Sequence, residues 1–241
     1  SKTIAFQNQA FGLDLKFHGI TSLNRVEHAK INVLSVFEGD FEVAFGTNSL
    51  EAGRLAVASL EAATKALKEG QIDALVTAPI NKSNVQSERF SFPGHTDYLA
   101  KELGGEALMF MISEGLRVGL LTDHIAVSEV SNAITTKRIR DKVKTMSQSL
   151  IQDFGIVRPR IALLGINPHS GDDGTIGSED DTIMRPAIAT LFDEGILAFG
   201  PYAADGFFGS SAYSQFDGVI AAYHDQGLVA FKALSFGQGV N

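Results

Sequence analysis

Three histidines stand where an apolar run gives way to a loop, and they are the residues best suited to chemistry. His124 ends LRVGLLTDH, His169 ends RIALLGINPH, and His224 follows GVIAAY. In an open α/β sheet, ligands bind beyond the carboxyl ends of the strands, so such imidazoles can serve one site. Neutral imidazoles hold divalent cations and leave a position open for water or substrate. The pattern predicts a cation that acts as a Lewis acid on a carbonyl or alkoxide oxygen, although its spacing matches no local metal motif.

Charged residues beside these histidines extend the candidate site. Asp123 and Asp225 each adjoin a strand-end histidine, where they would be metal ligands, supports for a ligand or ordinary turn residues. Lys232 lies in a mostly apolar run, and lysine is rarely buried without a partner. It is therefore an anion contact, a proton donor with a desolvated amine, or a surface lysine whose stem packs on apolar neighbours.

Two polar loops could contact an oxygen-rich ligand. APINKSNVQSERFSFPGHTDYLA holds His95 and Thr96, which suit an anionic ligand, unless Thr96 or Asp97 only caps the next helix. NPHSGDDGTIGSEDDT has glycines that permit close approach of a ligand, but its acids oppose a bare phosphate. This second loop therefore favours hydroxyl recognition or metal support, and its Ser178 and Asp181 resemble a capping box.

Alternating strands and helices must position these residues, as is typical of α/β proteins. Polar caps and terminal glycines predict helices at 49–69, 97–103, 135–154 and 178–194. Apolar runs predict strands at 72–77, 107–112, 117–122, 160–166 and 218–223, with shorter β segments at 3–6, 13–17, 31–37 and 41–45. Residues 201–215 are expected to form a long connection, and His224 and Asp225 a turn.

Composition narrows the class of protein. The 241 residues, 44% apolar and 20% charged, predict one interleaved two-lobe α/β unit over 1–241 without linker-separated domains. A net charge of −8 argues against nucleic-acid binding, and no cysteine is present for disulfides or thiolate metal sites. No apolar run approaches ~18 residues, so we expect no membrane span and a cytoplasmic protein. No GxGxxG follows a strand, which excludes a Rossmann fingerprint.

Five segments together resemble one enzyme family. They are VTAPINK, PGHTDYLA, TDHIAVSEVSNAIT, GINPHSGDDGTIGSEDDT and AAYHDQGLVAFKALSFGQGVN. In this order they resemble the 4-hydroxythreonine-4-phosphate dehydrogenases of pyridoxal phosphate synthesis. The resemblance implies the two-lobed α/β fold of isocitrate and isopropylmalate dehydrogenases. The family also has a glycine-rich start and a segment after the equivalent of Asn241 that are not found here, so we expect a fold truncated at both ends.

The same resemblance assigns roles to individual residues. It implies metal ligands at His124, His169 and His224, substrate contacts at His95, Thr96, Lys232 and Asn241, and a supporting acid at Asp205. Lys232, Asp205 and Asp225 are the candidates for the catalytic base, and no residue is assigned to the cofactor. Family members are homodimers with sites at the subunit interface, which implies ligands scattered along the chain.

The implied reaction uses NAD and a divalent metal (Zn, Mg or Co). NAD would oxidise the secondary hydroxyl of 4-phosphohydroxy-L-threonine, and decarboxylation would give 3-amino-2-oxopropyl phosphate. The cation would stabilise the oxygen that becomes negative in both steps. Three alternatives stay open: a sibling enzyme acting on threonate or erythronate 4-phosphate, a noncatalytic metal-binding fragment or dimerisation partner, and a metal-dependent phosphohydrolase.

Overall fold

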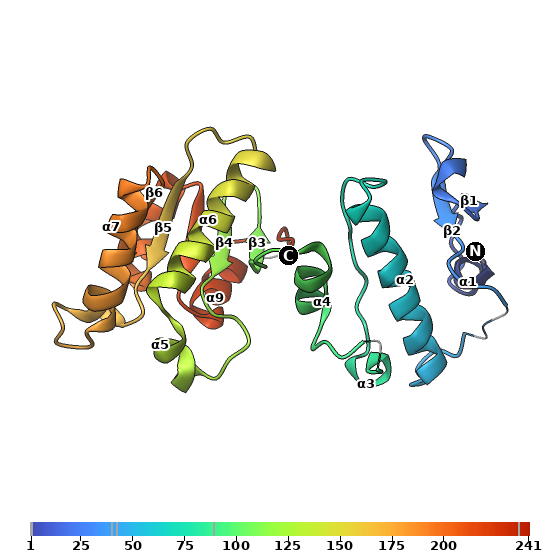
Figure 1. Cartoon of the computed structure of the whole chain (residues 1–241), viewed down its shortest axis with the longest axis horizontal. Coiled ribbons are helices and arrows are strands. Elements are labelled where there is room, and N and C mark those ends of the chain that lie inside the picture. Colours follow the sequence, from blue (N-terminus) through green and yellow to red (C-terminus); the bar gives the residue numbers. More distant parts are fainter. Residues whose placement is uncertain (1, 40, 42, 89, 236) are drawn as a thin grey trace. The chain divides into compact units, whose positions relative to one another are not determined.

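Two compact units make up the chain, and each is described by itself. The computed structural model describes residues 2–39, 41, 43–88, 90–235 and 237–241. The N-terminal unit is Ser1–Gly105 and the C-terminal unit is Glu106–Asn241 (Figure 1). Whether they form one interleaved two-lobe unit stays a prediction. Across the described residues, no helix is both long enough and apolar enough to cross a membrane.

A five-stranded sheet organises the C-terminal unit. Its order is β3 (Phe110–Ile112), β4 (Arg117–Leu120), β7 (Gly218–Ala221), β5 (Arg160–Leu164) and β6 (Leu197–Tyr202). β3 is antiparallel to β4, whereas β4, β7, β5 and β6 pair in parallel. The predicted strands at 107–112, 117–122, 160–166 and 218–223 are confirmed with shorter bounds, and the fold is mixed α/β as expected.

Helices bury both faces of this sheet. Alternate strand residues point to opposite sides. Ile161, Leu163 and Ile220 pack with residues of α6 (Thr136–Gln152) and α7 (Arg185–Asp193). Ala162 and Val219 pack on the other side with residues of α8 (Ala204–Gly209) and α9 (His224–Leu234). The unit therefore has three layers, and only the edges and ends of the sheet remain open for a site.

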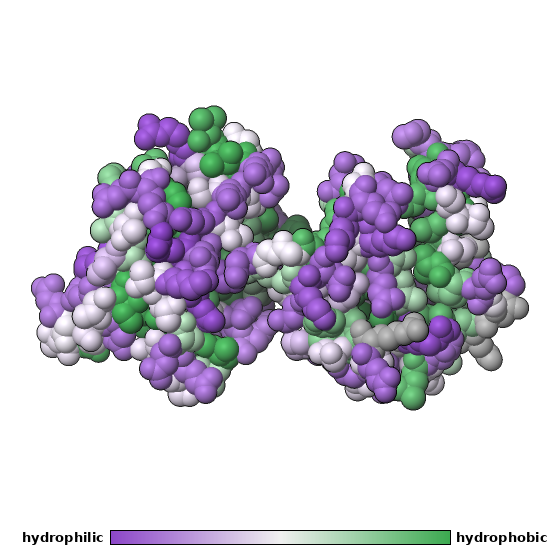
Figure 2. All heavy atoms as spheres, in the orientation of Figure 1, coloured by the Kyte–Doolittle hydropathy of each residue, from purple (hydrophilic) through white to green (hydrophobic). Residues whose placement is uncertain are grey.

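α6 packs closely on the strands that precede two of the histidines. It starts where the Thr135 hydroxyl accepts the backbone N–H of Arg138, as its predicted cap requires. Fully buried Met146 lies over two strand glycines: a Cβ at Gly119 would come 2.6 Å from its Cε, and one at Gly218 2.7 Å from its Sδ. The outer surface of α6 is charged, and this side of the unit is mostly hydrophilic in Figure 2.

The N-terminal unit is built on α2 (Leu50–Lys68), which confirms the helix expected at 49–69 and its Ser49 cap. α3 (Lys82–Val85) and α4 (His95–Leu103) share a buried cluster with α2. β1 (Phe17–Ile20) and β2 (Ile31–Leu34) form a separate parallel pair, and α1 spans Lys2–Ala10. This unit also has a short helical segment at Leu23–Arg25. The short helical segments of the C-terminal unit are Val127–Glu129, α5 (Val130–Ala133), Pro168–Gly171, Asp180–Met184 and Ala212–Gln215.

Several expected strands of the N-terminal unit are wrong or shortened. Residues 3–6 lie in α1, and of the segments at 13–17 and 31–37 only Phe17 and Ile31–Leu34 are in strands. No strand occurs at 72–77 or in the described residues of 41–45; Glu42 lies outside the described residues. An apolar run becomes a strand only when another strand pairs with it, and no such partner is seen within the described part of the chain.

Three local predictions in the C-terminal unit also need correction. Residues 201–215 were expected as a connection, but β6 continues to Tyr202 and α8 follows it. His224 and Asp225 open α9 rather than a turn. The helix expected at 178–194 starts as a wide π turn at Asp180–Met184 before α7, and the Asp181 carboxylate accepts from Arg185 instead of forming a capping box.

We expect Met146→Ala to destabilise the C-terminal unit by about 2–5 kcal/mol, because it opens a cavity over Gly119 and Gly218, which have no side chains to fill it. Urea unfolding followed by circular dichroism measures the change. Val157→Ala is the control, since Val157 is 85% exposed and its truncation should change stability by under about 0.5 kcal/mol. Equal losses in both variants would contradict this packing.

Candidate functional site

Polar residues follow all four parallel strands at the same edge of the sheet. His124 follows β4, His224 follows β7, His169 follows β5, and Asp205 follows β6. The strands lie side by side in the order β4, β7, β5, β6, about 4.8 Å apart. The four residues therefore form a row beyond the carboxyl ends of the parallel strands, which we call the carboxyl edge. Asp205 had been placed by resemblance alone, and β6, which the sequence did not reveal, gives it a structural position.

Two of the three predicted metal ligands are neighbours. The ring centroids of His124 and His224 lie 5.6 Å apart, with the rings tilted by 40°. The Asp225 Oδ1 lies 2.7 Å from His224 Nδ1, which leaves the other ring nitrogen free for a ligand. The Asp123 carboxylate accepts the backbone N–H of His124 at 2.9 Å and so shapes the turn after β4. The structure thus gives each aspartate a supporting contact.

His169 does not join this pair within one chain. It is exposed, in the turn Pro168–Gly171, with a left-handed backbone (φ 54°). No set of three or more His, Asp or Glu side chains among the described residues is arranged to hold a metal ion. A single chain therefore presents a histidine pair, and a third ligand from His169 needs another arrangement or another copy.

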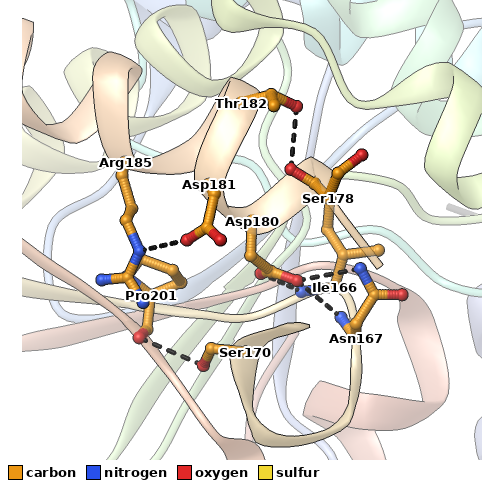
Figure 3. A network of polar contacts seen from close by, with 9 residues as sticks. All are labelled: Ile166, Asn167, Ser170, Ser178, Asp180, Asp181, Thr182, Arg185 and Pro201. Carbon is orange, nitrogen blue, oxygen red and sulfur yellow. Dashed lines mark hydrogen bonds and ion pairs between the residues drawn. The ribbon is translucent and has the colours of Figure 1, made fainter. Parts of the chain in front are cut away.

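A buried carboxyl group holds the loop that carries His169 (Figure 3). Asp180 is fully buried, and it accepts the backbone N–H groups of Ile166 at 2.8 Å and Asn167 at 3.0 Å. The Asn167 side-chain amide donates to the same carboxyl group at 3.0 Å. Gly165 makes room for this contact, because a Cβ there would lie 2.9 Å from an Asp180 oxygen. The exit from β5 is therefore fixed before the chain reaches His169.

Glu179 connects this loop to the segment after His124. Its carboxylate accepts from the Ser131 hydroxyl at 2.6 Å and from the Asn167 side chain at 2.9 Å. The hydrogen bond from Ser131 is the largest cause that holds the pKa of Glu179 below its ordinary value, followed by backbone N–H donors and Asn167. Because Ser131 lies in α5, the network spans the loops of two of the histidines.

Gln226 links the ends of β7 and β5. Its side-chain oxygen accepts the N–H of Ala222 at 2.7 Å, and its nitrogen donates to the Gly165 carbonyl at 2.7 Å. Sequence reasoning missed this role, and it treated Asp180 only as one of several acids. The signal available for Gln226 was an uncharged amide directly after His224 and Asp225, flanked by apolar runs.

The remaining candidates are spread more widely. Lys232 is exposed on α9, and at about 1.5 Å per helical residue it lies about 12 Å along the axis from His224. Asn241 is exposed. His95 and Thr96 open α4 in the N-terminal unit, where His95 lines a cavity of ≈ 280 Å³ with residues of α2 and 75–80.

Comparison with known proteins places this chain in a family. The family model described as pyridoxal phosphate biosynthetic protein PdxA matches residues 1–241. The 4-hydroxythreonine-4-phosphate dehydrogenase of Bacteroides thetaiotaomicron is 43% identical over 242 residues, covering 100% of this chain. The chain belongs to the PdxA family. The expected resemblance is confirmed.

Other members and solved structures agree with this membership. The Sulfurihydrogenibium 4-hydroxythreonine-4-phosphate dehydrogenase is 40% identical over 95% of the chain. A crystal structure of such a dehydrogenase from Burkholderia phymatum is 31% identical, with a TM-score of 0.84 over 98% of this chain and 72% of that one. A terephthalate 1,2-cis-dihydrodioldehydrogenase from Burkholderia xenovorans is also similar, at 27% identity and a TM-score of 0.66, over 96% and 72% of the two chains.

The PdxA-family relatives are longer than this chain and are named as dehydrogenases. The chain spans 66% of the Bacteroides protein and 70% of the Sulfurihydrogenibium protein. These relatives are dehydrogenases by name, and the family model belongs to pyridoxal phosphate biosynthesis. The names of the relatives thus suggest a reaction class to test, and the residues that follow the parallel strands are the ones to test for it.

We expect Ser131→Ala to lower stability by about 1 kcal/mol at neutral pH, because Glu179 loses its shortest hydrogen bond. The low folded-state pKa of Glu179 contributes stability above its ordinary value of 4.5, and this contribution disappears as the pH falls through the depressed pKa. The difference between wild type and variant should therefore shrink in acid. Urea unfolding between pH 7 and pH 3 measures it.

Ser128→Ala is the matched control for this substitution. Ser128 is exposed on the same segment, and no side-chain contact to the Glu179 network is seen for it in the described structure. Its removal should leave the stability unchanged across the pH range. A Ser131→Ala effect that stays constant with pH would show that the Glu179 bond is not its cause.

Proposed function

We propose that this chain supplies the metal-holding part of an NAD-dependent decarboxylating dehydrogenase. The substrate is 4-phosphohydroxy-L-threonine, which is oxidised at its secondary hydroxyl and loses carbon dioxide to give 3-amino-2-oxopropyl phosphate. The observation that carries the proposal is the pair His124 and His224, 5.6 Å apart at the carboxyl edge. The names of the PdxA-family relatives support the substrate, and the proposed architecture is the two-lobed fold of isocitrate dehydrogenase.

The residues at this edge fit a divalent cation. Zinc binds imidazole nitrogen at about 2.0–2.1 Å, so two imidazoles on one ion must have neighbouring rings, as His124 and His224 do. The contact of Asp225 with His224 is the kind of support that orients a metal-binding histidine. Imidazole and carboxylate donors suit Zn, Co or Mg, and the chain has no cysteine for a thiolate site.

A homodimer would provide the third ligand. His169 is exposed and does not group with the other two within the described part of one chain. In our proposal, the His169 loop of a second copy completes the site at the subunit interface. A rigid loop suits this role. If His169 is already held in place before the two copies associate, less conformational entropy is lost when it binds the metal of the other copy.

Residues of this chain would accept the proton of the substrate hydroxyl and bind the charged groups of the substrate. When bound, the cation would act as a Lewis acid on the substrate oxygen, and NAD would accept the hydride from the carbinol carbon. Among the three base candidates, Asp225 already contacts His224, and Lys232 lies about 12 Å along α9. Asp205 is exposed just beyond β6, and all three residues stay candidates for the group that takes the hydroxyl proton.

The proposed substrate contacts rest on the family resemblance. Lys232 would bind an anionic end of the substrate at a distance from the histidine pair, as a point charge. His95, Thr96 and Asn241 would donate hydrogen bonds to its oxygens. The proposed location is the cytoplasm, and the proposed substrate is a small phosphorylated hydroxy acid. No part of this proposal requires a nucleic acid or a membrane.

We expect His224→Ala to weaken Co²⁺ binding by at least tenfold, because it removes one imidazole of the pair. Titration followed by the visible absorption of bound Co²⁺ measures the affinity. His28→Ala is the control, since His28 is exposed in the N-terminal unit and outside the proposed site. Unchanged Co²⁺ affinity in His224→Ala would show that the histidine pair does not bind the metal and would contradict the proposal.

We expect 4-phosphohydroxy-L-threonine to drive NAD reduction in the presence of a divalent metal, and a chelator to abolish it. The assay follows NADH absorbance with this chain and with a version extended to the length of the relatives. Activity on threonate or erythronate 4-phosphate alone would reject the substrate. Release of inorganic phosphate without NAD would indicate a hydrolase, and metal binding without NAD reduction in the extended protein a noncatalytic role.

A further inference from the structure

Asp180 is an acid that the proposed reaction does not use, yet it is the only fully buried acid among the described residues. A buried carboxylate is costly unless its oxygens accept hydrogen bonds. Here each oxygen receives a backbone N–H, from Ile166 to Oδ1 and from Asn167 to Oδ2. The Asn167 side chain adds a third donor. The site is therefore built to keep a carboxylate at the exit of β5.

Its neighbour Asp181 has the same side chain but different contacts. Asp181 points outward to Arg185, whose Nε donates at 2.7 Å, and both side chains are partly exposed (Figure 3). Asp180 points inward to the loop from β5 (Figure 3). The two residues have the same side chain and lie on the same helical turn, so they form a natural pair for comparison.

The loop beyond Asn167 has a backbone that needs to be held. His169 and Ser170 have φ values of 54° and 52°, in the left-handed region that side chains other than glycine disfavour. Such residues persist when the surrounding structure determines them. The Ser170 hydroxyl donates to the Pro201 carbonyl at 3.2 Å, which holds the far side of the turn. Asp180 holds the near side.

We propose that Asp180 is the positioning residue for His169. It fixes the amides of Ile166 and Asn167, and with them the direction in which the turn presents the imidazole. The inference rests on the proposed function, because it takes His169 to be a metal ligand. Asp180 itself does not contact the metal or the substrate; it acts through the backbone.

Asp180→Asn tests the role with almost no change in size. An amide offers one acceptor and one donor group, so one of the two backbone N–H groups would face an N–H₂ instead of an oxygen. We expect Co²⁺ affinity to fall about tenfold, as it does when a partner that orients a ligand is lost. The visible spectrum of bound Co²⁺ should also change, because the geometry of the ligands changes. Asp181→Asn, with the same loss of charge, should stay within twofold of wild type.

A second variant covers the case in which Asp180→Asn does not fold. Asn167→Ala keeps the backbone and Asp180 but removes the side-chain donor to both Asp180 and Glu179. It should weaken Co²⁺ binding and shift the spectrum in the same direction. Thermal unfolding of each variant, recorded without metal, shows which of them are folded at the temperature of the titration.

The outcomes separate this inference from the proposed function. Weaker Co²⁺ binding and a changed spectrum in folded Asp180→Asn or Asn167→Ala, with Asp181→Asn unchanged, support it. If His169→Ala weakens binding while the folded variants of Asp180 and Asn167 bind as wild type does, the inference is overturned and the metal site stands. If His169→Ala and His224→Ala both bind Co²⁺ as wild type does, the proposed function fails.

Discussion

The parallel pairing of β4, β7, β5 and β6 is the constraint on which the rest of the C-terminal unit depends. Helices cover both faces of these strands with apolar side chains. A polar site can therefore form only at the carboxyl edge, beyond the ends of the strands. The close approach of α6 is possible because Gly119 and Gly218 leave room for Met146. Packing therefore decides where the loops with the histidines begin, before any ligand is considered.

Loops at a sheet edge have backbone groups that the ladder no longer satisfies, and these groups need other partners. Asp180 satisfies the amides after β5, and Gln226 satisfies an amide after β7 and a carbonyl after β5. Each of these bonds joins one loop to another element. The same polar contacts that make the edge stable thus also restrict the positions of its side chains, and a metal site benefits from that restriction.

Local signals in the sequence were sufficient for the helices with clear caps, such as α2 after Ser49 and α6 after Thr135. β6 escaped notice because Gly200 and Pro201 interrupt its apolar run; proline is tolerated there since β6 is at the sheet edge. The opening of α9 was mistaken for a turn because polar residues separate two apolar runs. In both cases a few polar, glycine or proline residues interrupted the apolar pattern at the end of an element or inside it, and the pattern alone did not show that the element continued or began there.

The candidate site, too, could be predicted from the sequence only in part. The three histidines could be picked from the sequence because each follows an apolar run, but the proximity of His124 and His224 depends on β4 lying next to β7. That pairing joins segments about one hundred residues apart, and no local pattern encodes it. The inward direction of Asp180 was equally hidden, since Asp181 beside it is chemically identical and points outward.

Charge gives a last reason to expect a cation at this edge. The chain has a net charge of −8, and Asp172 and Asp173 are exposed on the loop that follows His169. A phosphorylated acid approaching these residues would meet repulsion, and one lysine about 12 Å along α9 offsets only part of it. The amino end of α9, at His224, adds a partial positive charge of the helix dipole. The proposed divalent ion on the histidine pair would add the positive charge that the proposed substrate needs, so this proposal implies that metal and substrate binding are coupled electrostatically.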